Sequence, residues 1–241
     1  EGVKYEGVKY EGVKYEGVKY EGVFLKMTFS GFANAERSEN TNLMRLAYGS
    51  YYHLYNRGTN RTNLFSAAAD YTNFLQRYFY YMEPVADTFA YVLMPNHFHF
   101  LLRIKLAEAQ WAYREAFPNE KHPPNRLLNA STQFGHCCNG FAKYINAKYH
   151  RTGSLFEHAF KTKEVCEERY FGALIRYIHQ NPVRHGFVEN PQDWYHSSFA
   201  AYLTHPEKTR IKIAEGIQVF GSWDGFLAAH QVTVEETFFD D

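Results

Sequence analysis

The stretch from Tyr91 to Ile104, Tyr-Val-Leu-Met-Pro-Asn-His-Phe-His-Phe-Leu-Leu-Arg-Ile, constrains the fold more than any other part of the chain. Pro and Asn favour turns, so Met94-Pro-Asn96 predicts a tight turn between two runs that are rich in apolar residues. Two such runs joined by a tight turn form a β-hairpin. We therefore expect an incoming strand near residues 88–93 and an outgoing strand near residues 97–104.

The outgoing strand carries two histidines at positions that share one face. Successive side chains of a strand point to opposite faces, so His97 and His99 point the same way, while Phe98 and Phe100 pack on the other side. Imidazole is the commonest neutral metal ligand, and two imidazoles side by side on a strand make half of a metal site. The alternative is an ordinary hairpin with two histidines on a half-polar face.

The segments around this hairpin alternate between strand-like and helix-like patterns. Residues 51–58 alternate and are rich in aromatics, which predicts a strand, and Ser66 is the expected N-cap of a helix at 67–82. The further elements that we expect are a helical turn at 107–117, helices at 125–149 and 164–180, short extended pieces at 154–162 and 183–188, and a loop with a short helix at 190–203. This order predicts an α+β fold, in which an antiparallel or mixed sheet is covered by helices.

The two ends of the chain differ from its body in composition. Residues 1–23 are four copies of Glu-Gly-Val-Lys-Tyr followed by Glu-Gly-Val, a period that matches no solenoid repeat, and residues 24–44 are polar. We interpret 1–45 as a low-complexity tail and linker, 46–203 as one domain, and 204–241 as an acidic C-terminal appendage.

Composition and cysteine usage set the broad class. Hydrophobic residues make up 45% and aromatic residues 18% of the 241 residues, which indicates a globular protein with a core. No apolar run approaches the roughly 20 residues of a membrane span, and no secretory signal is visible, so we expect a cytoplasmic protein without membrane contact. The three cysteines form no CxxC pair, which argues against a disulfide framework or a zinc site.

The overall net charge of zero conceals a basic body. Residues 24–213 carry 22 Lys and Arg against 15 Asp and Glu, a net charge of +7, whereas residues 214–241 carry six acids and no Lys or Arg. A basic body fits a polyanionic partner such as a nucleic acid, although many solvated surfaces have the same composition.

A later expected helix carries a second pair of chemistry-bearing residues. Tyr177 and Asn181 are four apart and so share one helix face. An amide oxygen can serve as a hard ligand for Mg²⁺ or Mn²⁺, and a tyrosine can attack a target that a metal polarises. Each residue also has a simpler interpretation, as a tyrosine of an amphipathic helix and as an asparagine that ends a helix before Pro182.

Four motifs in this order resemble the HUH single-strand transposases and, within them, the REP-associated tyrosine transposases of the IS200-like group. They are Tyr55-Asn-Arg-Gly58, Met94-Pro-Asn-His-Phe-His-Phe-Leu-Leu102, Tyr149-His-Arg-Thr-Gly-Ser-Leu-Phe156 and Tyr177-Ile-His-Gln-Asn-Pro-Val-Arg184, followed by Trp194-Tyr-His-Ser-Ser198. The resemblance covers roughly residues 46–203. The family usually has a basic residue near the position of Ala159, and this departure weakens the case for DNA contacts along that strand.

The resemblance implies a ferredoxin-like HUH-nuclease sandwich that acts on DNA. It implies that His97 and His99 bind a divalent metal, Mg²⁺ or Mn²⁺, with Asn181 as a third, amide-type ligand. It further implies that Tyr177 attacks a phosphate of single-stranded DNA. The implied activity is that of a transposase and endonuclease, which cleaves and rejoins DNA at hairpin-associated, repetitive palindromic sites through a 5′-phosphotyrosine intermediate. A homodimer stays open as an assembly.

We expect DNA contacts from polar residues near these motifs, namely Asn56, Arg57, Arg61, Arg151, Lys161, Lys163 and Arg184. His53 and His185 receive no role. Two other functions stay open. One is a domesticated protein that binds hairpin DNA on the same scaffold without cleaving it. The other is a metal-dependent phosphohydrolase with water as its nucleophile, although such enzymes usually hold their metals with carboxylates, and residues 88–105 contain none.

Overall fold

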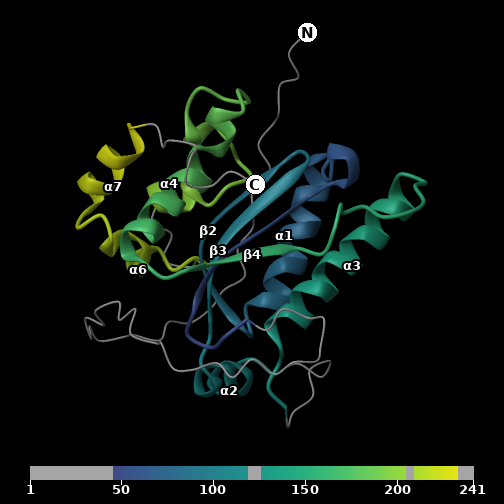
Figure 1. Cartoon of the computed structure of the whole chain (residues 1–241), viewed down its shortest axis with the longest axis horizontal. Coiled ribbons are helices and arrows are strands. Elements are labelled where there is room, and N and C mark those ends of the chain that lie inside the picture. The colour runs from purple at the N-terminus through teal and green to yellow at the C-terminus, as the bar shows by residue number, and fades with distance from the viewer. Residues whose placement is uncertain (1–45, 119–125, 205–208, 233–241) are drawn as a thin grey trace.

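A four-stranded sheet forms the centre of the molecule. The computed structural model describes residues 46–118, 126–204 and 209–232, so the expected repeats and linker at 1–45 lie outside the described residues. The strands are β1 (Tyr51–Arg57), β2 (Ala86–Met94), β3 (His97–Ile104) and β4 (Lys161–Val165) (Figure 1). Their order is β2-β3-β1-β4, and each neighbouring pair is antiparallel. The predicted α+β fold with a helix-covered sheet is confirmed.

The hairpin that the sequence predicts is the pair β2 and β3. Its register places Met94 opposite His97 and Val92 opposite His99. A β-bulge near Thr88 gives β2 one extra residue. Because β3 lies between β1 and β2, those two strands run parallel to each other, which is the split β-α-β arrangement of a ferredoxin-like fold.

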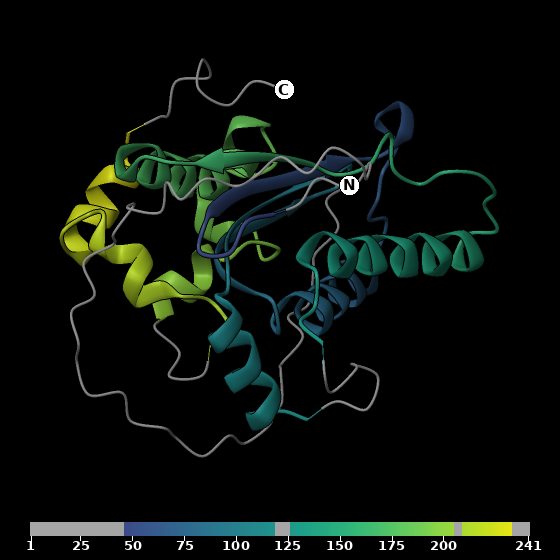
Figure 2. The same cartoon turned by 60° about the horizontal axis from the view of Figure 1, so that its bottom comes forward.

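Two helices, α1 (Ala68–Met82) and α3 (Ala130–Lys148), cover one face of the sheet (Figure 2). Their aromatic side chains meet those of β3. Tyr78 stacks on Phe100 with 3.9 Å between ring centroids, and Phe74 lies 5.0 Å from Phe98. All four rings are fully buried, so the apolar half of β3 forms the centre of the core.

A buried carboxylate joins the start of α1 to the end of α3. Asp70 accepts hydrogen bonds from the N–H groups of Ser66 and Ala67, which have no helical partner at the start of α1. It also accepts from the Lys148 ammonium at 2.6 Å and from the Tyr149 hydroxyl at 2.7 Å. The start of α1 is therefore capped by Asp70, and the expected N-cap role of Ser66 is wrong.

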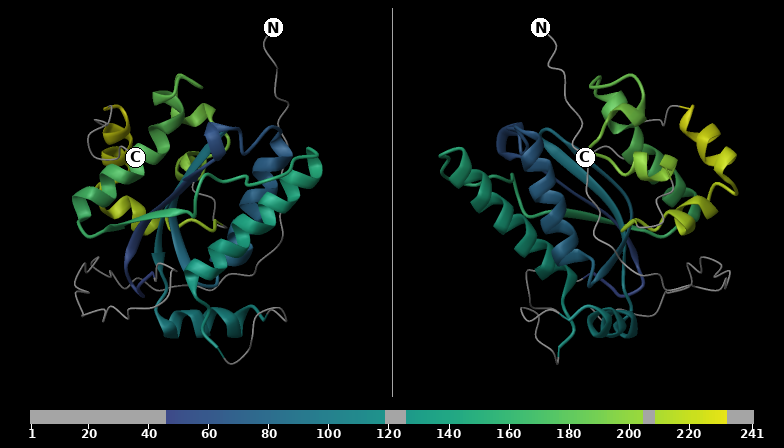
Figure 3. Two further views of the ribbon diagram at one scale, coloured as in Figure 1. Left: turned by 45° about the vertical axis from the view of Figure 1, so that its right-hand side comes forward. Right: turned by 180° about the vertical axis from the view of Figure 1, so that it is seen from behind.

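A third long helix, α4 (Glu168–Arg184), lies across the opposite face of the sheet (Figure 3). Phe171 packs against Phe89 of β2 and Tyr51 of β1, with ring centroids 5.1 and 5.3 Å apart. These contacts hold the first turn of α4 on the sheet face that carries His97 and His99. The rest of the helix then runs over the two histidines.

Two of the expected boundaries around α4 are wrong. The helix was expected to end at Asn181-Pro182, but it continues to Arg184, and the extended piece expected at 183–188 is absent from the described chain. Proline removes one helical hydrogen bond, but here the loss falls in the last turn, where the N–H of His185 still reaches the carbonyl of Asn181 at 3.1 Å. The extended piece expected at 154–162 lies later, as β4.

Shorter helices connect the main elements, and those after α4 pack back onto the body. The remaining described elements are η1 (Thr59–Arg61), α2 (Ala107–Ala116), η2 (Pro191–Asp193), α5 (Phe199–Thr204), α6 (Ile213–Gln218) and α7 (Trp223–His230). Within the expected appendage, Phe226 is fully buried and His230 lies 3.1 Å from His179 of α4. Among the described residues, no helix combines the length and apolar character needed to cross a membrane.

Candidate active site

The face of the sheet beneath α4 carries a row of polar side chains. In the register of β1 and β3, Tyr55 lies opposite His99, and Arg57 lies opposite His97. Side chains that lie opposite each other in antiparallel strands share a face. The expected alternation is confirmed, because both histidines face α4 and the phenylalanines next to them face α1 and α3.

Helix α4 brings Tyr177 and Asn181 to these histidines. The Nε2 atom of His97 lies 3.0 Å from the Oδ1 atom of Asn181, and the ring centroids of Tyr177 and His99 are 5.4 Å apart. Asn181 is 1% exposed and Tyr177 is 9% exposed. The four residues that the sequence singles out therefore converge at one place, where His99, Tyr177 and Asn181 are buried and His97 is half-buried. Their chemical roles stay predictions.

Two histidines that received no role from the sequence also lie here. His53 of β1 is 2% exposed, and its Nε2 atom lies 2.9 Å from Nδ1 of His99. His185 is exposed, and its ring centroid lies 5.2 Å from that of His97. The four-residue spacing after Asn181 could have indicated His185, since both then share a helix face. Alternation in β1 restricts His53 to one face, but only the strand order shows that this face adjoins His99.

Both ring nitrogens of His97 face amide oxygens. Nδ1 lies 2.7 Å from Oδ1 of Asn96, whose amide nitrogen donates to the carbonyl of Arg61. A neutral imidazole has one N–H, so when Nδ1 donates to Asn96, the lone pair of Nε2 faces the lone pairs of Asn181. In an octahedron with ligands about 2.1 Å from Mg²⁺, neighbouring ligands lie about 3 Å apart, as these two acceptors do. The donor atoms therefore fit a divalent metal.

Burial keeps the histidines of this face neutral. It lowers the pKa of His97 to about 4 and that of His53 to about 3, and it lowers the pKa of His99 well below its usual value. A neutral imidazole keeps the lone pair that a metal ligand needs. In the described part of the chain, no three His, Cys, Asp or Glu side chains cluster as a metal site. The oxygen that faces Nε2 of His97 belongs to the amide of Asn181.

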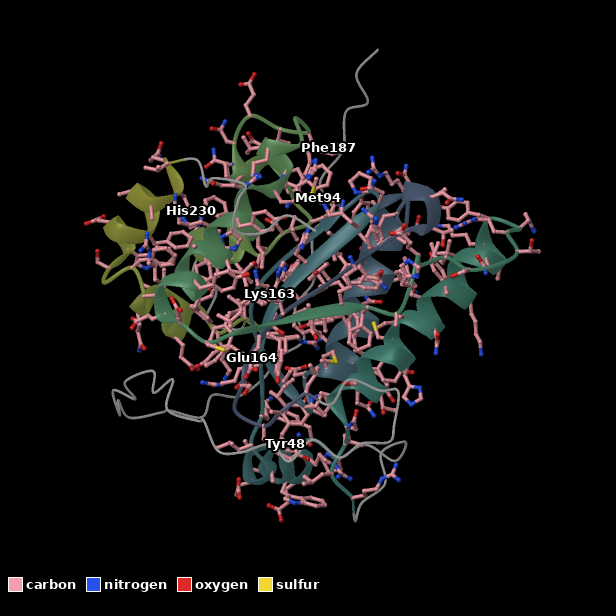
Figure 4. All side chains as sticks on the ribbon, in the orientation of Figure 1. Tyr48, Met94, Lys163, Glu164, Phe187 and His230 are labelled. Carbon is pink, nitrogen blue, oxygen red and sulfur yellow. The ribbon has the colours of Figure 1, made fainter. Side chains whose placement is uncertain are left out.

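Three of the basic residues expected to contact DNA lie beside this site. Lys161 and Lys163 of β4 are exposed and share the sheet face of His53 (Lys163 is labelled in Figure 4). Arg184 lies over the ring of Tyr177, with its guanidinium carbon 5.1 Å from the ring centroid. Positive charge on this side of the molecule favours an anionic ligand.

The other four expected DNA contacts are placed differently. Arg57 faces the site but is paired with the carboxylate of Glu157. Asn56 is 8% exposed and points to the opposite face, and its amide is bonded within the protein, so the structure does not support a DNA contact there. Arg61 is exposed, with a φ of 59° in the left-handed region. Arg151 follows α3, which covers the far face of the sheet.

The sequence of this chain is similar to that of one curated bacterial protein. No family model matches the chain. Over 113 residues, the chain is 26% identical to a protein of Haemophilus influenzae (strain ATCC 51907 / DSM 11121 / KW20 / Rd) that is provisionally named a REP-associated tyrosine transposase. This chain is similar to that transposase. The match covers 47% of this chain and 58% of the relative, so it spans little more than half of the transposase, and the resemblance expected from the four motifs is confirmed.

Solved structures give weaker likenesses. The structure of a REP-associated tyrosine transposase bound to a REP hairpin has a TM-score of 0.48 at 14% identity, over 71% of this chain and 88% of the other. A bacterial tRNA(His) guanylyltransferase-like protein in complex with GTP has a TM-score of 0.33 at 11% identity, over 59% of this chain and 68% of the other. At TM-scores below 0.5, neither likeness carries an argument about function.

Proposed function

We propose that this protein is a metal-dependent transposase and endonuclease for single-stranded DNA, which cleaves and rejoins strands at hairpin-associated sites through a 5′-phosphotyrosine intermediate. The observation that carries the proposal is the convergence of Tyr177 with His97, His99 and Asn181 on the sheet face beneath α4. The sequence similarity to a provisionally named tyrosine transposase supports the same class of reaction.

His97, His99 and Asn181 are the residues that would hold Mg²⁺ or Mn²⁺. His97 and Asn181 offer a nitrogen and an oxygen 3.0 Å apart, and His99 offers a second imidazole from the same strand face. When bound, the metal would neutralise charge that develops on the phosphate and would orient it. Because all three donors are neutral, they leave the full positive charge of the ion to attract an anionic substrate.

Tyr177 is the proposed nucleophile. Its phenolic oxygen forms a bond to the phosphorus of a DNA phosphodiester, and the bond from phosphorus to the 3′ oxygen breaks. The phenol loses its proton and the 3′ oxygen gains one, so the products are a 5′-phosphotyrosine and a free 3′-OH. A 3′-OH of another strand can reverse the step, and rejoining therefore needs no nucleotide cofactor. Arg184, 5.1 Å from the Tyr177 ring centroid, places a positive charge beside the phosphate.

The proposed substrate is a single strand that lies next to a DNA hairpin. Lys161 and Lys163, on the sheet face of His53, and Arg184, over the Tyr177 ring, would contact its backbone phosphates. Phe187 is 50% exposed just after α4 and offers a ring on which an unpaired base can stack. Single-stranded DNA presents both the phosphates and the unstacked bases that this surface suits.

The decisive experiment is the trapping of a covalent adduct. A labelled single strand that carries a short hairpin from the genomic repeats of the source organism is incubated with Mn²⁺ and the full chain, and is then resolved on a denaturing gel. We expect a shifted, protease-sensitive band, and we expect Tyr177→Phe to reduce it at least about a thousand-fold. Tyr170→Phe, on the same helix, is the matched control and should form the adduct like the native chain.

The other outcomes of this experiment point to other functions. Tight binding of the hairpin without an adduct would indicate a domesticated protein that binds but does not cleave. Cleavage that persists in Tyr177→Phe without an adduct would indicate water as the nucleophile. Loss of the adduct in Tyr170→Phe alone would move the nucleophile to that residue.

A further inference from the structure

His99 has a hydrogen-bonding partner outside the four converging residues. Nε2 of His53 and Nδ1 of His99 are 2.9 Å apart, and the two rings stack with centroids 5.1 Å apart. His53 is 2% exposed and His99 is 3% exposed. They come from neighbouring strands, β1 and β3, and their register is set by the backbone ladder between these strands. The pair is therefore held by the sheet and not by a loop.

The direction of this hydrogen bond decides which atom of His99 can bind a metal. A neutral imidazole carries one N–H and one lone pair. When Nδ1 of His99 donates to His53, Nε2 of His99 keeps its lone pair. When His53 donates instead, Nε2 of His99 carries the hydrogen and cannot be a ligand. Only the first tautomer is compatible with coordination through Nε2.

The other histidine of the strand shows the same pattern. Nδ1 of His97 lies 2.7 Å from Oδ1 of Asn96, an oxygen that can only accept. Nε2 of His97 in turn faces Asn181 at 3.0 Å. In both histidines Nδ1 is engaged by a neighbouring side chain, as expected when both present Nε2 to one metal ion.

We propose that His53 is a positioning residue of the metal site, which accepts the hydrogen bond from Nδ1 of His99 and thereby holds Nε2 of His99 as the ligating atom. This inference rests on the metal site of the proposed function. Carboxylates are common partners of ligating histidines, but a carboxylate here would add negative charge beside the substrate phosphate. A neutral imidazole orients His99 without that repulsion.

A second buried histidine pair provides a matched control. Nδ1 of His179 lies 3.1 Å from Nε2 of His230, and the two residues are 0% and 9% exposed. The pair joins α4 to α7, and His179 also contacts the Ser198 hydroxyl at 2.9 Å. Substitution of His230 therefore breaks a similar buried hydrogen bond without touching His99.

The first test uses the native full chain, without metal. Long-range ¹H–¹⁵N NMR distinguishes protonated from unprotonated ring nitrogens, and His99→Gln identifies the His99 signals by their disappearance. We expect the hydrogen of His99 on Nδ1 and the lone pair on Nε2. A hydrogen on Nε2 of His99 would overturn the inference, whatever the variants show.

The second test measures the affinity for Mn²⁺ in the absence of DNA. Electron paramagnetic resonance reports the concentration of free Mn²⁺. We expect His53→Phe to lower the affinity for Mn²⁺ roughly 10- to 100-fold. His53→Gln should recover most of the affinity, because its amide oxygen can accept the same hydrogen bond. His230→Phe, which removes the hydrogen bond to His179, should bind Mn²⁺ like the native chain. Thermal unfolding of each variant shows whether it is folded.

Several results would contradict the role of His53. Native affinity in a folded His53→Phe variant would show that the hydrogen bond is irrelevant to the metal. Equal losses in folded His53→Phe and His53→Gln would show that the acceptor is not what matters. If His53→Phe does not fold, His53→Gln and the native tautomer decide the question.

Failure of this inference can be told apart from failure of the proposed function. A native chain that binds Mn²⁺ with the expected dependence on His53, but forms no DNA adduct, leaves the inference in place and overturns the cleavage reaction. If the native chain forms the adduct but His53→Phe keeps the native Mn²⁺ affinity, the cleavage reaction stands and the role of His53 is overturned. A native chain that binds no Mn²⁺ overturns both.

Discussion

The two faces of the central sheet carry side chains of different chemical character. Beneath α1 and α3, Phe98 and Phe100 pack on other aromatic rings and need no hydrogen bond. Beneath α4, His99 is 3% exposed and bonds to His53, and His97 reaches Asn181. The same strand, β3, supplies both sets because its side chains alternate. One side of a strand can therefore pack in the core, while the residues on its other side form a polar site whose position that packing fixes.

The two faces also differ in what stabilises them. Burial of apolar area stabilises the first face and depends little on exact orientation. The second face buries polar groups, and each buried polar group that loses its partner costs about 1–3 kcal/mol. Substitutions on the first face should therefore change mainly the free energy of unfolding. Those on the second face should weaken metal and DNA binding and cost less stability than the loss of a buried ring.

The largest expected effect is on the aromatic face. Phe100→Ala should lower the free energy of unfolding by about 3–5 kcal/mol, because it removes a fully buried ring that stacks on Tyr78. Urea unfolding would measure the change. Phe117→Ala, whose ring is 50% exposed, is the control and should stay within about 0.5 kcal/mol of the native chain. Weakened Mn²⁺ binding by folded Phe100→Ala would show that the two faces are not separable.

The next effect is on the histidine face. His97→Ala should lower Mn²⁺ affinity at least about 100-fold, equal to about 2.7 kcal/mol, because it removes a donor that faces Asn181 at 3.0 Å. Its unfolding free energy should change less than that of Phe100→Ala. The control is His136→Ala, an exposed histidine of α3, which should bind Mn²⁺ normally. A loss of stability without any loss of Mn²⁺ affinity would assign His97 to packing alone.

A smaller effect is expected at Asp70, the buried carboxylate that joins α1 to α3 on the aromatic face of the sheet. Burial raises the pKa of Asp70, but hydrogen bonds from Lys148, Tyr149 and two backbone N–H groups outweigh it and lower the pKa on balance. A lowered pKa in the folded state means stability that is present above the unfolded pKa, about 3.9, and is lost as the pH falls through the folded value. Asp70→Asn should cost about 1–3 kcal/mol at pH 7.

The acid dependence of unfolding checks this assignment. Stability of the native chain, measured by urea unfolding from about pH 6 down to about pH 3, should fall more steeply than that of Asp70→Asn. Asp224→Asn, an exposed residue of α7, should follow the native curve. Parallel curves for the native chain and Asp70→Asn would show that the Asp70 carboxylate does not stabilise the junction of α1 and α3.

The smallest effect is on DNA affinity. Lys163→Ala should weaken binding of single-stranded DNA a few-fold and reduce the salt dependence of the binding constant by about 0.7 per lost phosphate contact. Lys143→Ala removes the same charge from an exposed position of α3, on the other side of the sheet, and should leave both quantities unchanged. Equal effects of the two substitutions would show that DNA does not distinguish the faces.

Local sequence patterns predicted much of the fold and of the candidate site. The period of two predicted that His97 and His99 share a face, and the four-residue spacing predicted that Tyr177 and Asn181 share another. The same period of two places Asn56 on the face opposite to Arg57, and the structure shows that Asn56 is buried there. The predicted end of α4 at Asn181-Pro182 was wrong, because the hydrogen bond that Pro182 cannot make falls in the last turn, where the helix continues to Arg184.

The sequence by itself determined which side chains lie together along one strand or one helix, because those periods follow from backbone geometry within a few residues. Only the tertiary structure decided that β1 lies between β3 and β4, which brings His53 to His99 across 46 positions of chain. It also decided that α4 covers the histidine face, which brings Asn181 to His97 across 84 positions. Such pairings depend on how whole elements bury their surfaces against one another, and no local period encodes that choice.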